Sequence, residues 1–228
     1  MKIIKSMRTK NEKSVKKYER RANYSAQIFC RMPYVRAVFL TGSLASGDAN
    51  ISSDIDMLVV TKMGRIFTAR LFVILAATIM GIKRTKNPDK NHAGKVCLNY
   101  FLTENYLKIP HGRGEKIDKY CAENYSQAKF LAGDYQIFEK FFEVNRKLFK
   151  QYQITNIKLQ INSRSQSHYP FYRTRLGNWF EEQLKAIQIR RIESDPITAK
   201  YPHLIVYNDQ ELRFHPPKFS KNNGTARK

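Results

Sequence analysis

The chain has 228 residues, of which 42% are hydrophobic, so it can bury a real core and form one domain with an appendage or two small domains. It carries 41 Lys and Arg against 19 Asp and Glu, a formal net charge of +22 that is expected of a protein that meets polyphosphate or nucleic acid. An anionic membrane surface and a merely solvated basic surface are the alternatives. The three cysteines are widely spaced and give no disulfide framework or zinc pattern, and no secretory signal is evident, so we expect a cytoplasmic protein.

The first 21 residues are strongly basic, with nine Lys or Arg against two Glu. From Glu12 onward, apolar residues recur at steps of three and four, which predicts an amphipathic helix that ends before Pro33. This segment serves either as an arm against a phosphate backbone or as a helix packed behind a sheet with its basic face in solvent.

Two apolar runs follow, at residues 35–40 and 54–61, and both are predicted to be strands. Side chains alternate along a strand, so Asp54 and Asp56 share one face about 6.6–7 Å apart while Ile55 and Met57 enter the core. Two carboxylates beside an apolar sheet repel each other and are best tolerated when a divalent cation lies between them. Magnesium is the expected ion, since it takes a few carboxylate oxygens and leaves positions for substrate phosphates.

The connection between these strands, residues 42–53, is predicted to be a phosphate-binding loop. Gly42 allows close approach of the backbone to a ligand, and the amides and hydroxyl around Ser43 can donate hydrogen bonds to phosphate oxygens. Ser53 would orient the carboxylates or contact phosphate, or is simply solvated.

The pattern Gly42-Ser43, ten residues, then Asp54-Ile55-Asp56 resembles the hallmark of the nucleotidyltransferase-fold superfamily, and the resemblance extends over roughly residues 11–150. The surrounding sequence is similar to a bacterial-type branch described as nucleotidyltransferase domain proteins. The resemblance implies an α/β (α+β) fold with a small mixed sheet backed by helices. It also implies Mg²⁺ or Mn²⁺ held by Asp54 and Asp56, and a nucleoside triphosphate as substrate.

Residues 66–82 are predicted to form a buried helix, whose apolar part is too short to cross a bilayer. Arg65 precedes it. The resemblance favours contact of Arg65 with the triphosphate, and a surface salt bridge is the alternative.

A third strand is predicted at residues 96–102. The resemblance implies a third carboxylate here, but the strand contains no acid, and its one polar residue is Asn99. Asn99 can offer a neutral oxygen to a metal but cannot act as a general base. Alternatively, Glu104, just beyond the strand, supplies the third carboxylate, or the protein binds nucleotide and metal without transferring a nucleotide.

Two helices are then predicted, at residues 118–131 and 134–152. Asp134 is the expected N-cap of the second helix, whose aromatic stripe is expected in the core.

The segment 162–175 mixes Arg with Tyr and Phe, a combination that binds single-stranded nucleic acid, although a linker explains it equally well.

A further helix at residues 172–192 carries one apolar side, a short hairpin is predicted from 204–207 and 211–214, and a disordered basic tail follows. The apolar side consists of Leu176, Trp179, Phe180, Leu184 and Ile187.

We therefore expect a basic arm and helix over 1–34, a nucleotidyltransferase core over 35–153, a helical and hairpin extension over 154–214 and a tail over 215–228. The predicted reaction is transfer of a nucleoside monophosphate from a nucleoside triphosphate to an acceptor hydroxyl, preferably an RNA 3′ end. The alternatives are a protein hydroxyl, as in AMPylating antitoxin-type members, and a noncatalytic RNA-binding protein that retains the fold.

Overall fold

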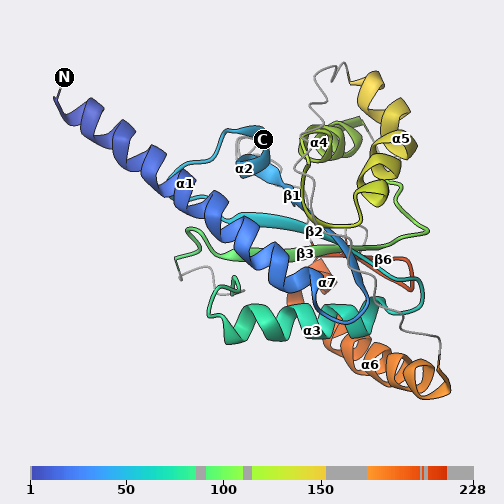
Figure 1. The fold of residues 1–228 in the computed structure, drawn as a ribbon. Helices are drawn as coiled ribbons and strands as arrows, with labels where there is room; N and C mark the ends of the chain where they lie inside the picture. The colour runs from blue at the N-terminus through green and yellow to red at the C-terminus, as the bar shows by residue number, and fades with distance from the viewer. Residues whose placement is uncertain are drawn as a thin grey trace, which may run out of the picture.

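The computed structural model describes residues 2–85, 91–109, 115–152, 174–200, 202 and 205–214. In this part of the chain, six strands form one sheet in the order β4-β1-β2-β3-β6-β5, and only the β2–β3 pair is parallel (Figure 1). This confirms the mixed sheet backed by helices. The strands are β1 Val35–Thr41, β2 Ile55–Thr61, β3 Val96–Thr103, β4 Lys129–Gly133, β5 Val206–Tyr207 and β6 Glu211–Arg213. The helices are α1 Lys2–Cys30, α2 Gly42–Ser46, α3 Ile66–Ile79, α4 Glu115–Ser126, α5 Tyr135–Gln151, α6 Arg175–Glu193 and α7 Pro196–Lys200.

Helices cover both faces of the sheet, α1 and α3 on one side and α4 and α5 on the other (Figure 1). Strand alternation explains this sandwich, because Met57 and Val59 of β2 pack towards α1 and α3 whereas Leu58 and Val60 pack towards α4 and α5. All four side chains are fully buried. The central strands are therefore apolar on both faces, and polar side chains are accommodated where the strands begin or end.

Helix α5 matches its prediction closely. The Asp134 side chain accepts a hydrogen bond from the Gln136 amide at 3.0 Å, so it caps the helix. The aromatic stripe lies in the core, where Phe138 meets Phe39 of β1 edge-on with ring centroids 4.9 Å apart.

Several element boundaries differ from the sequence prediction. The helix predicted over 118–131 was wrong in its second half, because α4 ends at Ser126 and residues Lys129–Gly133 form β4 along the edge of β1. Pairing with β1 outweighs the local helical pattern. Gly133 makes this pairing possible, since a Cβ there would lie 2.3 Å from the carbonyl oxygen of Arg36. The helix expected from Glu12 instead begins at Lys2, and the first residues of the predicted phosphate loop form the short helix α2.

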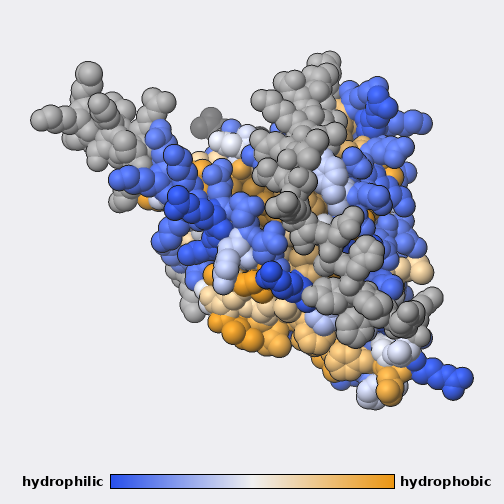
Figure 2. Space-filling view, viewed as in Figure 1, coloured by the Kyte–Doolittle hydropathy of each residue, from blue (hydrophilic) through white to orange (hydrophobic). Residues whose placement is uncertain are grey.

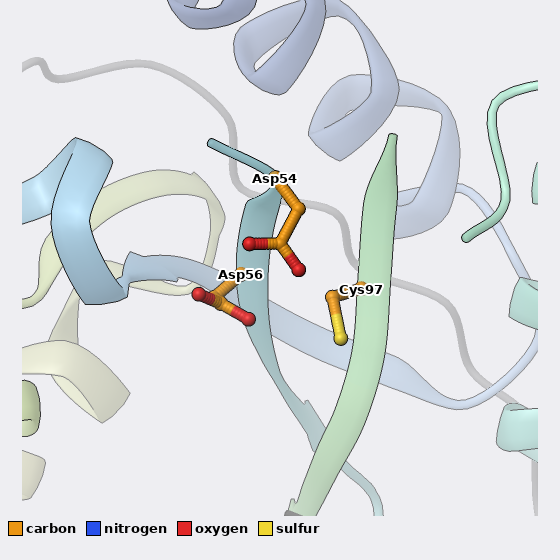
Figure 3. Close-up of side chains that lie close together, drawn as sticks. All are labelled: Asp54, Asp56 and Cys97. Atoms are coloured by element: carbon orange, nitrogen blue, oxygen red, sulfur yellow. The ribbon is translucent and has the colours of Figure 1, made fainter. Parts of the chain in front are cut away.

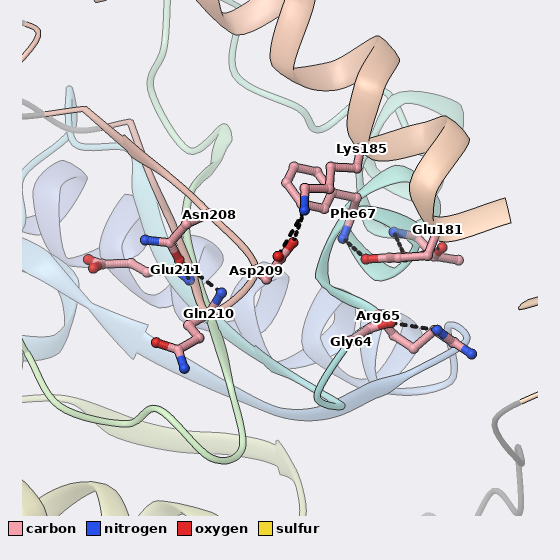
Figure 4. Close-up of polar contacts among 10 residues, drawn as sticks. Gly64, Arg65, Phe67, Glu181, Lys185, Asn208, Asp209, Gln210 and Glu211 are labelled. Carbon is pink, nitrogen blue, oxygen red and sulfur yellow. Dashed lines mark hydrogen bonds and ion pairs between the residues drawn. The ribbon is translucent and has the colours of Figure 1, made fainter. Parts of the chain in front are cut away.

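The apolar side predicted for α6 is largely exposed. Trp179 is 63% exposed and Leu176 80% exposed. The face that packs includes polar contacts: the Glu181 carboxylate is buried and accepts hydrogen bonds from the Phe67 and Thr68 amides, each at 2.9 Å (Figure 4). These amides lie in the first turn of α3 and lack partners within their own helix. The Glu181 side chain of α6 therefore caps the N-terminus of α3.

The C-terminal hairpin was predicted correctly as β5 and β6, and β6 extends the sheet beside β3. Lys185 of α6 contacts the Asp209 carboxylate in the hairpin turn at 2.8 Å (Figure 4). Most of the aromatic and basic segment 162–175 and the tail 215–228 lie outside the described residues. Within the described ranges, every helix is too short or too polar to traverse a bilayer.

Candidate active site

The two aspartates predicted as metal ligands lie where β2 begins. Because β2 and β3 run parallel, their first residues meet at one edge of the sheet, and Asp56 pairs with Cys97. The ligand atoms of Asp54, Asp56 and Cys97 all lie within 4.8 Å of one another (Figure 3). Among the residues that the structure describes, these three form the group of acidic, Cys and His side chains able to hold a metal ion. The sequence prediction missed Cys97.

A bulge in β3 explains the position of Cys97. Between the pairs Asp56–Cys97 and Leu58–Tyr100, β3 has one residue more than β2. This extra residue brings Cys97 onto the same face as Tyr100, whereas strict alternation along β3 would have put them on opposite faces. Asn99 lies within the bulge, and its carbonyl accepts a hydrogen bond from the Phe214 amide at 2.9 Å. Its role as a third ligand stays a prediction.

The Cys97 thiol is neutral at physiological pH. Burial, together with the negative charge of Asp56, raises its pKa to about 12, while Arg84 acts in the opposite direction. A neutral thiol is a poor ligand for Mg²⁺ and a poor general base. Cys97 therefore cannot take over the metal binding or proton transfer of a third carboxylate, although it lies beside Asp56.

Arg84 adds a positive charge that the sequence did not reveal. Its Nη1 lies 2.5 Å from Asp54 Oδ2 and 3.5 Å from Cys97 Sγ. Burial opposes the charge of Arg84, but the neighbouring Cys97 and Asp54 outweigh burial and raise its pKa, so it stays cationic. The Arg84 amide donates to the Val96 carbonyl at 2.8 Å, which holds this residue beside the start of β3. The contact joins residues 30 apart in the chain, and no local motif signals it.

Gly42 shapes the other side of the site. It has a φ of +69°, and a Cβ at this position would lie 2.4 Å from Asp56 Oδ2, so only glycine fits without displacing the carboxylate. Ser43 follows within α2 and is half-buried. Ser53 stabilises the turn before Asp54, because its hydroxyl accepts a hydrogen bond from the Asn50 amide at 2.9 Å.

The residues present fit a divalent ion held by two carboxylates. Asp54 and Asp56 offer the oxygen ligands that Mg²⁺ and Mn²⁺ prefer, and the absent side chain of Gly42 leaves room beside Asp56. The third nearby donor, the Cys97 sulfur, does not suit these ions.

Two other residues considered from sequence lie at the opposite end of β2, a strand that spans roughly 20 Å. Arg65 Nη2 contacts Asn178 Oδ1 of α6 at 2.6 Å, close to the start of α3 (Figure 4 shows Arg65 there). The Glu104 amide bonds to the last residue of β2, and its carboxylate pairs with Arg36 at 3.1 Å. The structure does not bring Arg65 or Glu104 to the aspartate pair.

Part of the chain is similar to a family of known proteins. The family model described as "Nucleotidyltransferase domain" matches residues 23–127, which include Gly42, both aspartates, Arg84 and Cys97. A search of curated proteins finds no match. A chain from a solved structure described as "Crystal structure of the toxin-antitoxin with AMP-PNP" is similar with 20% identity, over 57% of this chain and 86% of that chain. Its TM-score is 0.31, a likeness too distant to bear on the chemistry of the site. Residues 23–127 of this chain are therefore similar to the nucleotidyltransferase domain family.

Proposed function

We propose that this protein transfers a nucleoside monophosphate from a nucleoside triphosphate to an acceptor hydroxyl and releases pyrophosphate. The observation that carries the proposal is the pairing of Asp54 with Asp56 at an edge of the sheet, next to a glycine turn that no larger residue fits. The family supplies the reaction class. Asp54 and Asp56 would hold Mg²⁺ or Mn²⁺, which neutralises the phosphate charge that develops during transfer.

The chain's own residues position the substrate. The Ser43 hydroxyl and the amides of the Gly42 turn are assigned to the β- and γ-phosphates, and Ser53 keeps the turn before Asp54 in place. Asn99 remains the proposed neutral ligand on β3. Arg65 has no assigned role in the transfer, because its guanidinium is engaged by Asn178. A neutral Cys97 cannot take the proton of the acceptor hydroxyl, so we expect a slow enzyme.

An RNA 3′ end is the proposed acceptor. The outer side of α1 exposes Lys13, Lys16, Lys17 and Arg20, and Figure 2 shows a hydrophilic surface along this helix. The inner side of α1 contacts the two segments that flank the site: Tyr18 donates to the Ile51 carbonyl at 2.7 Å, and Arg21 donates to the Gly94 carbonyl at 2.6 Å.

The cations of α1 therefore adjoin the loops that carry the aspartates, where they would bind a polyanionic acceptor. This placement and the net charge of +22 favour RNA over a protein hydroxyl as the acceptor. The cytoplasm is the compartment in which such an enzyme would meet both substrates.

The test is incubation with labelled nucleoside triphosphates, Mg²⁺ or Mn²⁺, and RNA whose 3′ end is either free or blocked. We expect label on the free 3′ end alone and a loss on the order of a hundredfold or more in Asp54→Asn and Asp56→Asn. These substitutions remove a charge and keep the shape of the side chain. Label on protein instead of RNA would favour the AMPylating alternative. If the parent protein transfers no label and both variants bind RNA normally, the noncatalytic alternative is correct.

A further inference from the structure

We infer that the site uses a single divalent ion, and that the guanidinium of Arg84 occupies the place of a second cation beside Asp54. The inference rests on the proposed function and deepens it. Its basis is the contact of Arg84 Nη1 with Asp54 Oδ2 at 2.5 Å, within the cluster that also contains Asp56 and Cys97.

The charges within the cluster limit how many ions it can hold. Asp54 and Asp56 contribute two negative charges, and Arg84, paired with Asp54, contributes one positive charge. In the nucleotide-free site the sum is one negative charge, which a single divalent ion already overcompensates. A second ion at Asp54 would add two positive charges next to a guanidinium, with no third carboxylate in the cluster to offset them.

Arg84 is held in place as a fixed part of the site. Its amide donates to the Val96 carbonyl at 2.8 Å, and Lys83 forms a parallel bridge with Val96, so the backbone is fixed against the start of β3. Its side chain is only 27% exposed and has Asp54 and Cys97 as neighbours. An arginine does not lose its proton in a protein, so this cation is permanent.

The guanidinium also has the right form to contact the substrate. Nη1 makes the contacts with Asp54 and Cys97, and the fork has further N–H groups in the same plane. We assign these groups to a phosphate oxygen of the nucleotide. Arg84 thereby orients the Asp54 carboxylate and neutralises substrate charge.

Mn²⁺ titration without nucleotide tests this inference independently of transfer activity, with free Mn²⁺ followed by electron paramagnetic resonance. We expect the parent protein and Arg84→Lys, which keeps the charge, to bind one ion with similar affinity. Arg84→Ala and Arg84→Gln should bind Mn²⁺ about tenfold more tightly or take up a second ion, because a repelling charge is gone. In the same variants the rate of nucleotide transfer should fall. If Arg84 had a purely structural role, its substitution would not raise the Mn²⁺ affinity while lowering the rate of nucleotide transfer.

A gain-of-ligand series provides the second test. Cys97→Asp adds a carboxylate beside Asp56 and should still hold one ion while Arg84 is present, whereas the double variant Arg84→Ala/Cys97→Asp should hold two. Thermal unfolding of each variant shows that it is folded before it is titrated.

Three results overturn the inference: two ions in the parent protein, two ions in Cys97→Asp alone, or unchanged count and affinity in both Arg84→Ala and Arg84→Gln. In each of these cases the proposed transfer reaction still stands. A parent protein that binds no Mn²⁺ overturns both the inference and the metal site of the proposed function.

Discussion

Replacement of Gly42 by alanine should impair the site much more than it impairs folding. The new Cβ would lie 2.4 Å from Asp56 Oδ2, and ordinary van der Waals contact begins at 3.4 Å, so the carboxylate must retreat by about 1 Å. A misplacement of this size at a reacting centre costs roughly a hundredfold in rate. The folding cost is smaller, because the severe overlap is with the end of a side chain, and the Asp56 Cγ and Cβ, at 3.1 and 3.2 Å, need to shift by only a few tenths of an ångström. It amounts to the backbone penalty for a non-glycine residue at φ +69°, about 1–2 kcal/mol.

The assay compares Gly42→Ala with Gly81→Ala. Gly81 has nearly the same φ, +65°, but nothing lies within 4 Å of the position its Cβ would take. Both variants therefore carry the backbone penalty, and only Gly42→Ala displaces Asp56. Thermal unfolding should give similar melting temperatures for the two variants, while Mn²⁺ affinity and label transfer should fall in Gly42→Ala alone.

If Gly42→Ala retains the Mn²⁺ affinity and transfer rate of Gly81→Ala, the carboxylate of Asp56 is not where the metal and substrate are bound. If instead the two variants differ strongly in melting temperature, the added methyl group is resisted by the backbone and not relieved by the Asp56 side chain. Either outcome would refute the reasoning from the glycine turn.

Three further predictions concern helices. Glu181→Ala should destabilise the protein by about 3 kcal/mol or more, measured by denaturant unfolding, because it leaves the buried amides at the start of α3 without their charged acceptor. Asp134→Ala should cost about 1 kcal/mol in the same assay, since α5 loses its N-cap. Replacing Lys16, Lys17 and Arg20 by alanine should weaken RNA binding and reduce the dependence of log Kd on log salt concentration by about 0.7–0.9 for each phosphate that the helix no longer neutralises.

Each of these predictions has a matched control. Glu182→Ala changes an exposed neighbour on α6 and should leave stability nearly unchanged; equal losses at 181 and 182 would contradict the capping role. Asp134→Asn keeps a capping oxygen but loses the ion pair with Arg36, so a loss equal to that of Asp134→Ala would assign the effect to the ion pair.

For RNA binding, removal of Lys140, Arg146 and Lys147 from α5 deletes the same charge from the other face of the sheet. An identical loss of RNA binding in that variant would show that only net charge matters and that α1 is not the contact surface.

Much of the fold follows from local sequence. The strands β1 and β2 are mostly apolar runs, Asp134 is an ordinary N-cap, and the aromatic stripe of α5 has helical spacing, so each could be predicted without tertiary information. The strand β4 could not, because its five residues become a strand only by pairing with the edge of β1. The exposed apolar side of α6 was also unpredictable, since its packing is decided by the need of the α3 amides for the Glu181 carboxylate.

For the site, the sequence by itself determined the glycine turn, the two aspartates on one face and the absence of an acid from β3, because these depend on spacing within a strand and on residue type. Only the tertiary structure decided which distant side chains join them. The bulge in β3 turns Cys97 towards Asp56, and the bridge at Lys83 holds Arg84 against Asp54. Register and long-range pairing follow from how strands meet in space, and no periodicity along the chain encodes them.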